Sequence, residues 1–331
     1  LFVPAREDVS RKLAIFASNM EPMRRLLFSV LLLALLCCGT RCRESRRQAV
    51  ESPAAMPARV FLPAVPPGGM TAEQTHDYMR AHYWDKFDFA DTLFIAEIDT
   101  VEMLRAFAAW VGNYLAPDDP APVEALMAQA GSSRPMLAYF AMLAEKVLYD
   151  PNSPLRSDEL YIPVLEAQAA SPLLDEWEKI APLHDLRMAQ QNRPGERAND
   201  FRYTLADGSS RRLYDLGADY VLLFIYNPGC AMCQQLREAI VSSPMLNELT
   251  ERGELKVLAL YPDEDLGAWR AYSDRIPARW INAYDATQQL REKELYDLKA
   301  IPALYLLDRD KRVLVKDGTD SGQIEWVIDH R

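Results

Sequence analysis

The sequence predicts an α/β domain at the C-terminus, preceded by an all-α domain, and three observations indicate this fold class. Two continuous apolar runs, 220–226 and 255–261, are typical of strands buried on both faces of a sheet. Stretches with helical character follow each run, which is the alternation of a sheet covered on both sides. Between residues 71 and 192, in contrast, apolar residues recur at helical spacing and no strand pattern is found.

Length and composition limit the class of protein. The chain has 331 residues, enough for two domains, and 49% of them are hydrophobic, as in a folded globular protein. The formal net charge of −11 argues against a nucleic-acid partner, because nucleic-acid binding needs a basic face. The charge does not identify any other partner.

The N-terminal region has the pattern of an export signal. Arg24 and Arg25 precede an almost entirely apolar run over 26–36, so residues 23–37 are predicted to be a signal peptide. The run is much shorter than the roughly 20 residues that span a bilayer. Residues 1–22 are interpreted as an over-called extension. A buried core helix is the alternative interpretation of the apolar run.

Three cysteines lie at the end of this run. Leu35, Leu36 and Cys37 before Cys38 resemble a bacterial lipobox, so Cys38 is the predicted site of lipidation. Cys37 and Cys42 are alternative sites, and ordinary signal cleavage is an alternative process. We therefore expect a protein of the cell envelope, held to the membrane by a lipid anchor.

The next segments divide the rest of the chain. Residues 38–70 are rich in proline and are predicted to be a tether. Residues 71–192 form the predicted helical domain, with apolar helix faces at 101–110, 136–143 and 173–188. The aromatic-rich stretch 78–87 is interpreted as a helix face packed in the core rather than a binding surface. A break at 191–195 begins the second domain, 193–331.

The second domain starts with a change of period. Residues 200–205 alternate and are predicted to pair with 211–216 across a turn at Ala206-Asp207-Gly208. The two buried strands follow, and 303–308 and 311–315 form a later strand pair. Helices are predicted between and after these strands, over residues 231–250, 265–274, 286–297 and 322–329.

Cys230 and Cys233 lie where the first buried strand ends and a helix begins. Free amide groups and the positive end of the helix dipole stabilise a thiolate at a helix N-terminus. The spacing places the second sulfur one turn further into the helix and less exposed. We therefore predict that Cys230 attacks and Cys233 resolves the mixed disulfide. This chemistry uses the Cys230–Cys233 pair as a redox-active disulfide, and neither a cofactor nor a metal is expected.

Three other roles for the Cys230–Cys233 pair fit the sequence less well. A structural disulfide would close so small a loop that it restrains little of the unfolded chain. A zinc site needs four ligands, and the four histidines are scattered without ligand spacing. A peroxide-reducing cysteine needs an electrophile-binding Thr or Arg just before it, and residues 226–229 contain neither.

With these motifs, the chain resembles the TlpA-like thiol–disulfide oxidoreductases of the thioredoxin superfamily. The resemblance covers about residues 195–331 and rests on the segments 221–233, 257–263 and 298–308. It implies a thioredoxin-like sandwich that faces the periplasm and reduces, rather than oxidises, protein disulfides. The whole layout resembles a Bacteroidetes group of lipoproteins with an uncharacterised N-terminal helical domain. Protein thiols and disulfides are the implied partners, with a membrane electron donor.

The resemblance also places Ile301 and Pro302 opposite the cysteine pair. A cis Ile301–Pro302 bond costs little, because the trans preference before proline is below about 1 kcal/mol, and the strand, cysteine pair and helix upstream favour it here. It would leave the backbone groups of Ile301 free to pair with an extended substrate segment. A trans proline at a strand start is the alternative. Met232, between the cysteines, is predicted to form an apolar docking patch.

The sequence departs from the family pattern around the cysteines. This chain lacks the Trp that precedes the family's motif, the usual residues within the motif and the buried Asp on the strand before it. It also lacks the Glu and the Pro that follow the motif. The positions concerned are Phe224, Gly229, Ala231, Met232, Leu236 and Glu238. These replacements leave no obvious proton acceptor for Cys233. Glu238 and Glu264 are candidates, although both fit solvated surface charges better.

Two functional hypotheses follow from this sequence. The first is an envelope-anchored thiol–disulfide oxidoreductase in which the direction of electron flow is open. The second is a non-catalytic binding module of the envelope that uses the thioredoxin-like fold as a scaffold.

Overall fold

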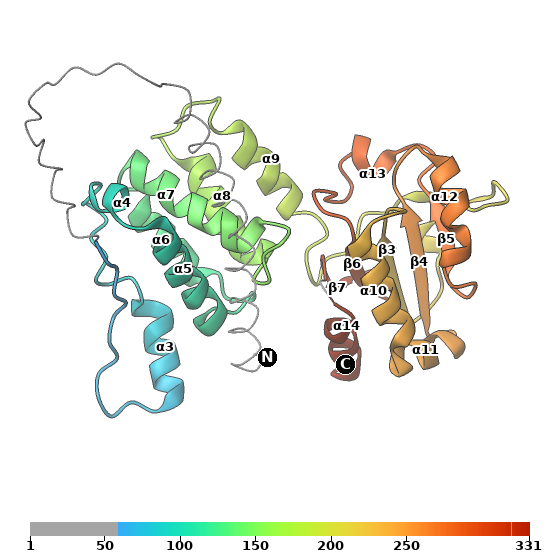
Figure 1. The fold of residues 1–331 in the computed structure, drawn as a ribbon, viewed down its shortest axis with the longest axis horizontal. Coiled ribbons are helices and arrows are strands. Elements are labelled where there is room, and N and C mark those ends of the chain that lie inside the picture. Colours follow the sequence, from blue (N-terminus) through green and yellow to red (C-terminus); the bar gives the residue numbers. More distant parts are fainter. Residues whose placement is uncertain (1–58, 319) are drawn as a thin grey trace, which may run out of the picture. The chain divides into compact units, whose positions relative to one another are not determined.

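The computed structural model describes residues 59–318 and 320–331, which form two compact units (Figure 1). The first unit ends at Leu160 and the second runs from Tyr161 to Arg331. The predicted signal peptide and the candidate lipidation sites Cys37, Cys38 and Cys42 lie outside the described residues. Within the described ranges, no helix is both long and apolar enough to cross a membrane.

The first unit is helical, as predicted. Side chains of Thr71, Asp99 and Ser133 cap the starts of three helices by accepting backbone N–H hydrogen bonds. The helices are α3 (Ala72–His82), α4 (Phe94–Glu97), α5 (Thr100–Tyr114), α6 (Ala121–Ala130) and α7 (Arg134–Ala144), which continues as the π-helical turn η1 (Glu145–Tyr149).

Aromatic side chains form the core of this unit. Trp84 is 5% exposed, and its ring packs edge-on against Trp110 and Phe140. Phe87 also contacts Phe140, with ring centroids 5.2 Å apart. The aromatic stretch 78–87 contributes Tyr83, Trp84 and Phe87 to the core, as predicted, but these residues follow the end of α3 and do not lie on a helix face.

Two further helices follow, α8 (Asp158–Ala170) and α9 (Ile180–Ala189). The predicted helix at 173–188 begins later than expected, at Ile180. The carboxylate of Asp175 accepts hydrogen bonds from the backbone N–H groups of Trp177 and Glu178, so the chain turns there before the helix starts.

The second unit contains one mixed sheet of seven strands in the order β2-β1-β5-β4-β3-β6-β7. Strands β3, β4 and β5 are parallel, and the remaining pairs are antiparallel. The strands are β1 (Arg202–Thr204), β2 (Ser210–Arg212), β3 (Tyr220–Ile225), β4 (Leu255–Tyr261), β5 (Ile281–Tyr284), β6 (Ala303–Asp308) and β7 (Val313–Val315).

Helices cover one face of this sheet in a way that its topology explains. The chain steps from β3 to β4 to β5 in one direction across the sheet, and right-handed crossovers then place the connecting helices on the same face. That face carries a core to which α10, α11, α12 and α14 all contribute (Figure 1). The helices are α10 (Ala231–Ser242), α11 (Pro244–Glu251), α12 (Leu266–Tyr272), α13 (Gln289–Glu292) and α14 (Ser321–Asp329).

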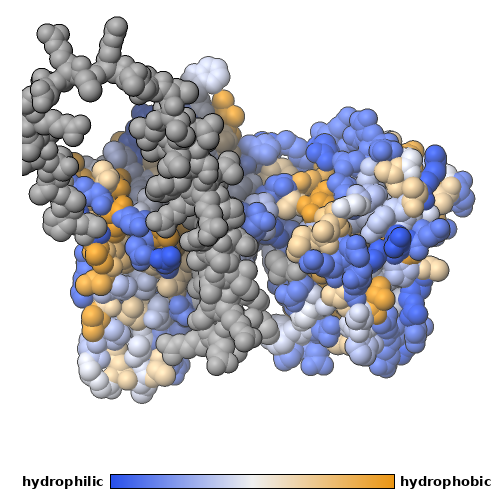
Figure 2. Space-filling view, in the orientation of Figure 1, coloured by the Kyte–Doolittle hydropathy of each residue, from blue (hydrophilic) through white to orange (hydrophobic). Residues whose placement is uncertain are grey.

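Strand β3 lies at the centre and is buried on both faces, as its apolar run predicted. Leu222 and Phe224 point to the helix-covered core, whereas Val221, Leu223 and Ile225 point to a second core on the other side. The second core is closed by segments around 198–216 and 290–296. The face of this unit that Figure 2 shows is mainly hydrophilic, with small separate apolar patches.

Three elements differ from the prediction. The expected helix 231–250 is divided at Ser243, whose hydroxyl caps α11 with Pro244 in its first turn. The expected helix 286–297 is only four residues long, because Gln288 and Glu294 adopt positive φ angles at its two ends. Strand β5 was not predicted, since Ile281–Tyr284 contains no continuous apolar run.

Candidate redox site

Cys230 lies in the turn between the central strand and α10. Gly229 just before it has a φ of +79°, a conformation that glycine adopts readily and other residues do not. This geometry gives a backbone reason for glycine at position 229. The chain then enters α10 with Cys230 as its N-cap residue.

The sulfur of Cys230 is held by the backbone around it. Its Sγ accepts a hydrogen bond from the backbone N–H of Cys233 at 3.1 Å. Its thiol donates to the carbonyl oxygen of Ile301 at 3.6 Å. Cys230 is partly exposed, so an incoming sulfur can reach it from solvent.

Cys233 lies one turn further along α10 and is 1% exposed. Burial raises the pKa of the Cys233 thiol to about 12; the neighbouring Cys230 adds to the rise, and the backbone of Asn227 opposes it. Both cysteines are free thiols. The pair therefore consists of one accessible sulfur and one shielded, protonated sulfur behind it.

The segment opposite the pair has the predicted geometry. The Ile301–Pro302 peptide bond is cis. Ala303 at the start of β6 pairs with Ile225 at the end of β3. Ile301 and Pro302 therefore lie just beyond the ends of these two strands, on the side where the cysteine turn follows β3. Met232 between the cysteines is 59% exposed, which leaves its side chain available on the same surface.

The two candidate acids do not contact the sulfurs. Glu238 lies on the exposed side of α10 and bonds to Gln234 and Arg237. Glu264 is exposed in the loop after β4. Among the described contacts, neither carboxylate hydrogen-bonds to Cys230 or Cys233.

A buried polar group near Cys233 was missed by the sequence analysis. The hydroxyl of Tyr226 donates to Oδ1 of Asn282 at 2.9 Å, and Trp269 Nε1 donates to the same oxygen at 3.0 Å. Burial raises the pKa of Tyr226 far above its usual value, and Cys233 is close enough to contribute to the rise. The phenol therefore stays neutral. Asn282 belongs to the unpredicted strand β5, so no sequence signal linked it to the motif.

No group of three or more His, Cys, Asp or Glu side chains in the described ranges is arranged to hold a metal ion. The chemistry that the described site offers is that of its two thiols.

Comparison with known proteins identifies similar chains. Residues 38–192 match the model of a family described as a domain of unknown function (DUF5106). The crystal structure of a thioredoxin-like protein from Bacteroides caccae is 42% identical, with a TM-score of 0.77, and the match covers 82% of this chain and 99% of that one. No curated protein matches the chain.

Two shorter structures match with lower scores. The C-terminal domain of an uncharacterized protein from Bacteroides fragilis is 44% identical, with a TM-score of 0.40, over 41% of this chain and 98% of that one. A domain of a possible thiol-disulfide isomerase from Cytophaga hutchinsonii is 24% identical, with a TM-score of 0.36, over 43% of this chain and 95% of that one.

Proposed function

The chain belongs to the thioredoxin-like family, and from this premise we propose that it is a TlpA-like thiol–disulfide oxidoreductase acting on protein disulfides. The observation that carries the proposal is the asymmetry of the pair. Cys230 is partly exposed at the N-cap of α10, and Cys233 is buried behind it. Thiol exchange needs one sulfur that meets the substrate and one that is reserved for the second step.

In the first step, the thiolate of Cys230 attacks one sulfur of a substrate disulfide. The substrate S–S bond breaks, a mixed disulfide forms on Cys230, and the other substrate sulfur leaves as a thiolate. The N-cap position supports this step, because the first backbone N–H groups of a helix and its dipole favour negative charge on the attacking sulfur. The N–H of Cys233 already points at Sγ.

In the second step, the substrate thiolate released in the first step takes up the proton of Cys233, and the sulfur of Cys233 attacks the sulfur of Cys230. The Cys230–Cys233 disulfide forms, and the second substrate sulfur leaves as a thiolate. Two electrons have then passed from the protein to the substrate. A dithiol donor must return two electrons before another cycle.

We propose that the pair works in the reducing direction. Strong protein oxidants owe their potential to a stabilised reduced form. Burial raises the pKa of Cys233, so this thiol adds no thiolate to the reduced pair and any such stabilisation belongs to Cys230. The proposed reducing direction therefore rests on the resemblance to TlpA-like thiol–disulfide oxidoreductases. The reduction potential is expected to lie nearer the roughly −270 mV of thioredoxin than the roughly −120 mV of DsbA. A measured potential at the oxidising end would reverse the direction.

We further propose that Ile301, Pro302 and Met232 contact the substrate. The backbone of Ile301 lies 3.6 Å from the attacking sulfur, measured from its carbonyl oxygen, so an extended segment bonded to Cys230 would run beside it. Met232, which lies between the two cysteines in the chain, adds exposed apolar surface next to the pair. Protein thiols and disulfides are therefore the proposed partners.

The proposed location is the cell envelope, facing the periplasm, with lipid attached to Cys38. This part of the proposal rests on the sequence pattern of residues 23–38. Radioactive palmitate fed to the native host should label the protein. Replacing Cys38 by alanine should abolish the label if Cys38 is the modified residue.

The catalytic proposal is tested with the full chain in the insulin-reduction assay, with dithiothreitol as electron donor. The protein should accelerate insulin precipitation, and Cys230→Ser should abolish the acceleration. Cys42→Ser is the matched control, since it makes the same change outside the motif. Equal rates with and without the protein would exclude catalysis and favour the non-catalytic binding module.

A further inference from the structure

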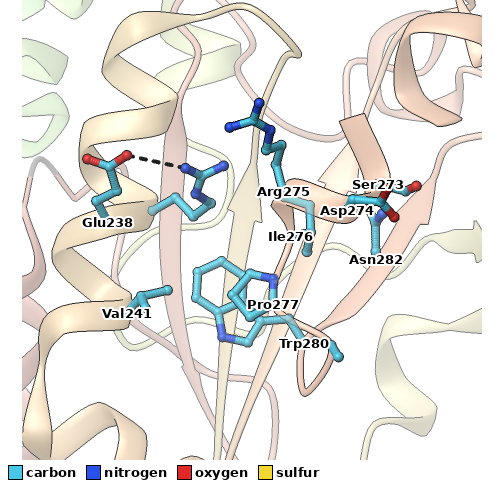
Figure 3. Close-up of a pocket in the computed structure, with 11 residues that line it drawn as sticks. Glu238, Val241, Ser273, Asp274, Arg275, Ile276, Pro277, Trp280 and Asn282 are labelled. Atoms are coloured by element: carbon cyan, nitrogen blue, oxygen red, sulfur yellow. Dashed lines mark hydrogen bonds and ion pairs between the residues drawn. The ribbon is translucent and has the colours of Figure 1, made fainter. Parts of the chain in front are cut away.

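A groove of about 650 Å³ lies on the helix-covered face of the second unit, between α10 and the segment that leads from α12 into β5 (Figure 3). It begins at Arg237 and reaches Val241, which are four and eight residues beyond Cys233 on α10. At about 1.5 Å per residue, these positions lie roughly 6 and 12 Å along the helix from that cysteine. The groove is therefore a separate site from the cysteine turn.

Hydrogen bonds to buried side chains fix the orientation of the side-chain amide of Asn282, which lines this groove. The Oδ1 of Asn282 accepts hydrogen bonds from Tyr226 and from the indole N–H of Trp269. An indole N–H can only donate, so the atom that faces it must be the amide oxygen. Asn282 lines the groove, and no described residue accepts a hydrogen bond from its NH₂ group. The NH₂ group of Asn282 is thus an oriented hydrogen-bond donor that is free to bind a ligand.

Two arginines add positively charged groups that can donate hydrogen bonds. The side chain of Arg237 is 11% exposed and donates to the hydroxyl of Tyr272 at 2.9 Å, which holds it in place. A guanidinium has five N–H groups, so several remain for a ligand. Arg275 makes no ion pair with a described residue, and its side chain extends from its loop toward α10 in Figure 3.

The acids of the groove set the charge of the ligand. Glu238 lies at the rim on α10, where it pairs with Arg237 at 3.4 Å, and Asp274 lies on the opposite side of the groove. Two arginines and two acids give a lining with no formal net charge. Glu238 already pairs with Arg237, whereas Arg275 makes no ion pair with a described residue, so its guanidinium group is the positive charge left to match a single carboxylate.

The remaining wall is apolar. Trp280, Ile276 and Pro277 line the side toward β5, and Val241 lines the side toward α10. Val241 is 42% exposed, so its side chain is available to a ligand in the groove. The volume is in the range of small-molecule sites, which combine apolar walls with a few placed polar groups.

We propose that this groove binds a small organic monocarboxylate, with an apolar group attached to the carboxylate. The NH₂ group of Asn282 and the guanidinium groups of Arg237 and Arg275 bind the carboxylate. The apolar group packs on Trp280 and Val241. The proposal does not depend on thiol exchange.

Phenylacetate and phenylacetamide test the proposal by isothermal titration of the full chain. The two compounds have the same shape, and only the first carries the charge. Phenylacetate should bind at one site, at least tenfold more tightly than phenylacetamide. Equal affinities, or no binding of phenylacetate at its highest usable concentration, would overturn the proposal.

Variants then locate the binding. Asn282→Asp keeps both inward hydrogen bonds but replaces the NH₂ donor by a negative oxygen, so phenylacetate affinity should fall at least tenfold. Arg275→Gln, at an exposed position that carries no folding risk, should also weaken binding several-fold. Arg279→Gln is the matched control on the same loop, because Arg279 pairs with Glu251 and does not line the groove. Unchanged affinity in Arg275→Gln, or an equal loss in Arg279→Gln, would contradict the assignment.

One further variant separates this inference from the proposed redox function. Cys230→Ser should bind phenylacetate with the affinity of the unmodified protein. A loss of binding in Cys230→Ser would place the ligand at the cysteine turn and refute a separate site.

Discussion

The backbone N–H of Cys233 donates a hydrogen bond to the Sγ of Cys230 over 3.1 Å. This contact makes Cys230 the N-cap of α10, a position that Ser, Thr, Asp or Asn usually occupies. The sulfur of Cys230 thus accepts the backbone N–H hydrogen bond that a side-chain oxygen usually accepts at the start of a helix. The two cysteines therefore have different environments although only two residues separate them, and the predictions below follow from that difference.

The first prediction concerns alkylation of the reduced protein. At pH 8, iodoacetamide should modify Cys230 and leave Cys233 unmodified until the protein is denatured. The reason is that Cys233 is 1% exposed and burial raises its pKa to about 12. Peptide mass mapping before and after denaturation distinguishes these two sites from the other cysteines. Rapid modification of Cys233 in the native protein would contradict the assigned roles.

The second prediction concerns stability at alkaline pH. The pKa of Cys233 is raised in the folded protein from an ordinary value of 9.0 to about 12. Its contribution to stability is fully present below pH 9 and is lost as the pH rises toward 12, because only the unfolded thiol ionises in that window. Between pH 8 and 10 the reduced protein should lose about 1 kcal/mol of unfolding free energy through this group.

Cys233→Ala supplies the control for the alkaline prediction, since it lacks the thiol but keeps the tyrosines and Cys230. Urea unfolding of both proteins at pH 8 and pH 10 gives the comparison. The stability gap between them should narrow at pH 10. A constant gap would mean that the buried thiol does not resist ionisation.

The third prediction concerns Gly229. Its φ of +79° should make Gly229→Ala destabilising by about 1 kcal/mol. Gly217→Ala is the matched control: an added Cβ meets no atom within 4 Å at either position, and only Gly229 has a positive φ. Denaturation midpoints measure both. Equal effects would show that the backbone conformation at Gly229 does not require glycine.

The fourth prediction concerns Met232. Replacing it by serine should raise the KM for a protein disulfide several-fold while the reaction with a small linear disulfide such as oxidised glutathione stays unchanged. The reason is that its 59% exposed side chain lies between the two cysteines and contacts only a large substrate. Val241→Ser makes a similar change at an exposed site further along α10. An unchanged KM in Met232→Ser would remove this residue from the docking surface.

The sequence was informative where local chemistry decides the structure. The run 220–226 and the pair Cys230 and Cys233 predicted a buried strand followed by a helix start, because a central parallel strand is apolar on both faces. Pro302, taken together with the strand, cysteine pair and helix before it, predicted the cis bond that the structure contains.

The sequence was uninformative where the structure depends on distant partners. Strand β5 has only four residues and owes its place to pairing with β4 and β1, so its own sequence carries no strand pattern. The network of Tyr226, Trp269 and Asn282 was missed with it. The helix break at Ser243 was visible only as a Ser-Pro pair that also occurs within loops.

The central claim is that Cys230 attacks and Cys233 resolves. Its most direct test is Cys233→Ala in the native host, with non-reducing electrophoresis and mass mapping of the full chain. The mixed disulfide should accumulate on Cys230, and Cys230→Ser should accumulate none. Absence of any mixed disulfide on Cys230 in Cys233→Ala would contradict the account.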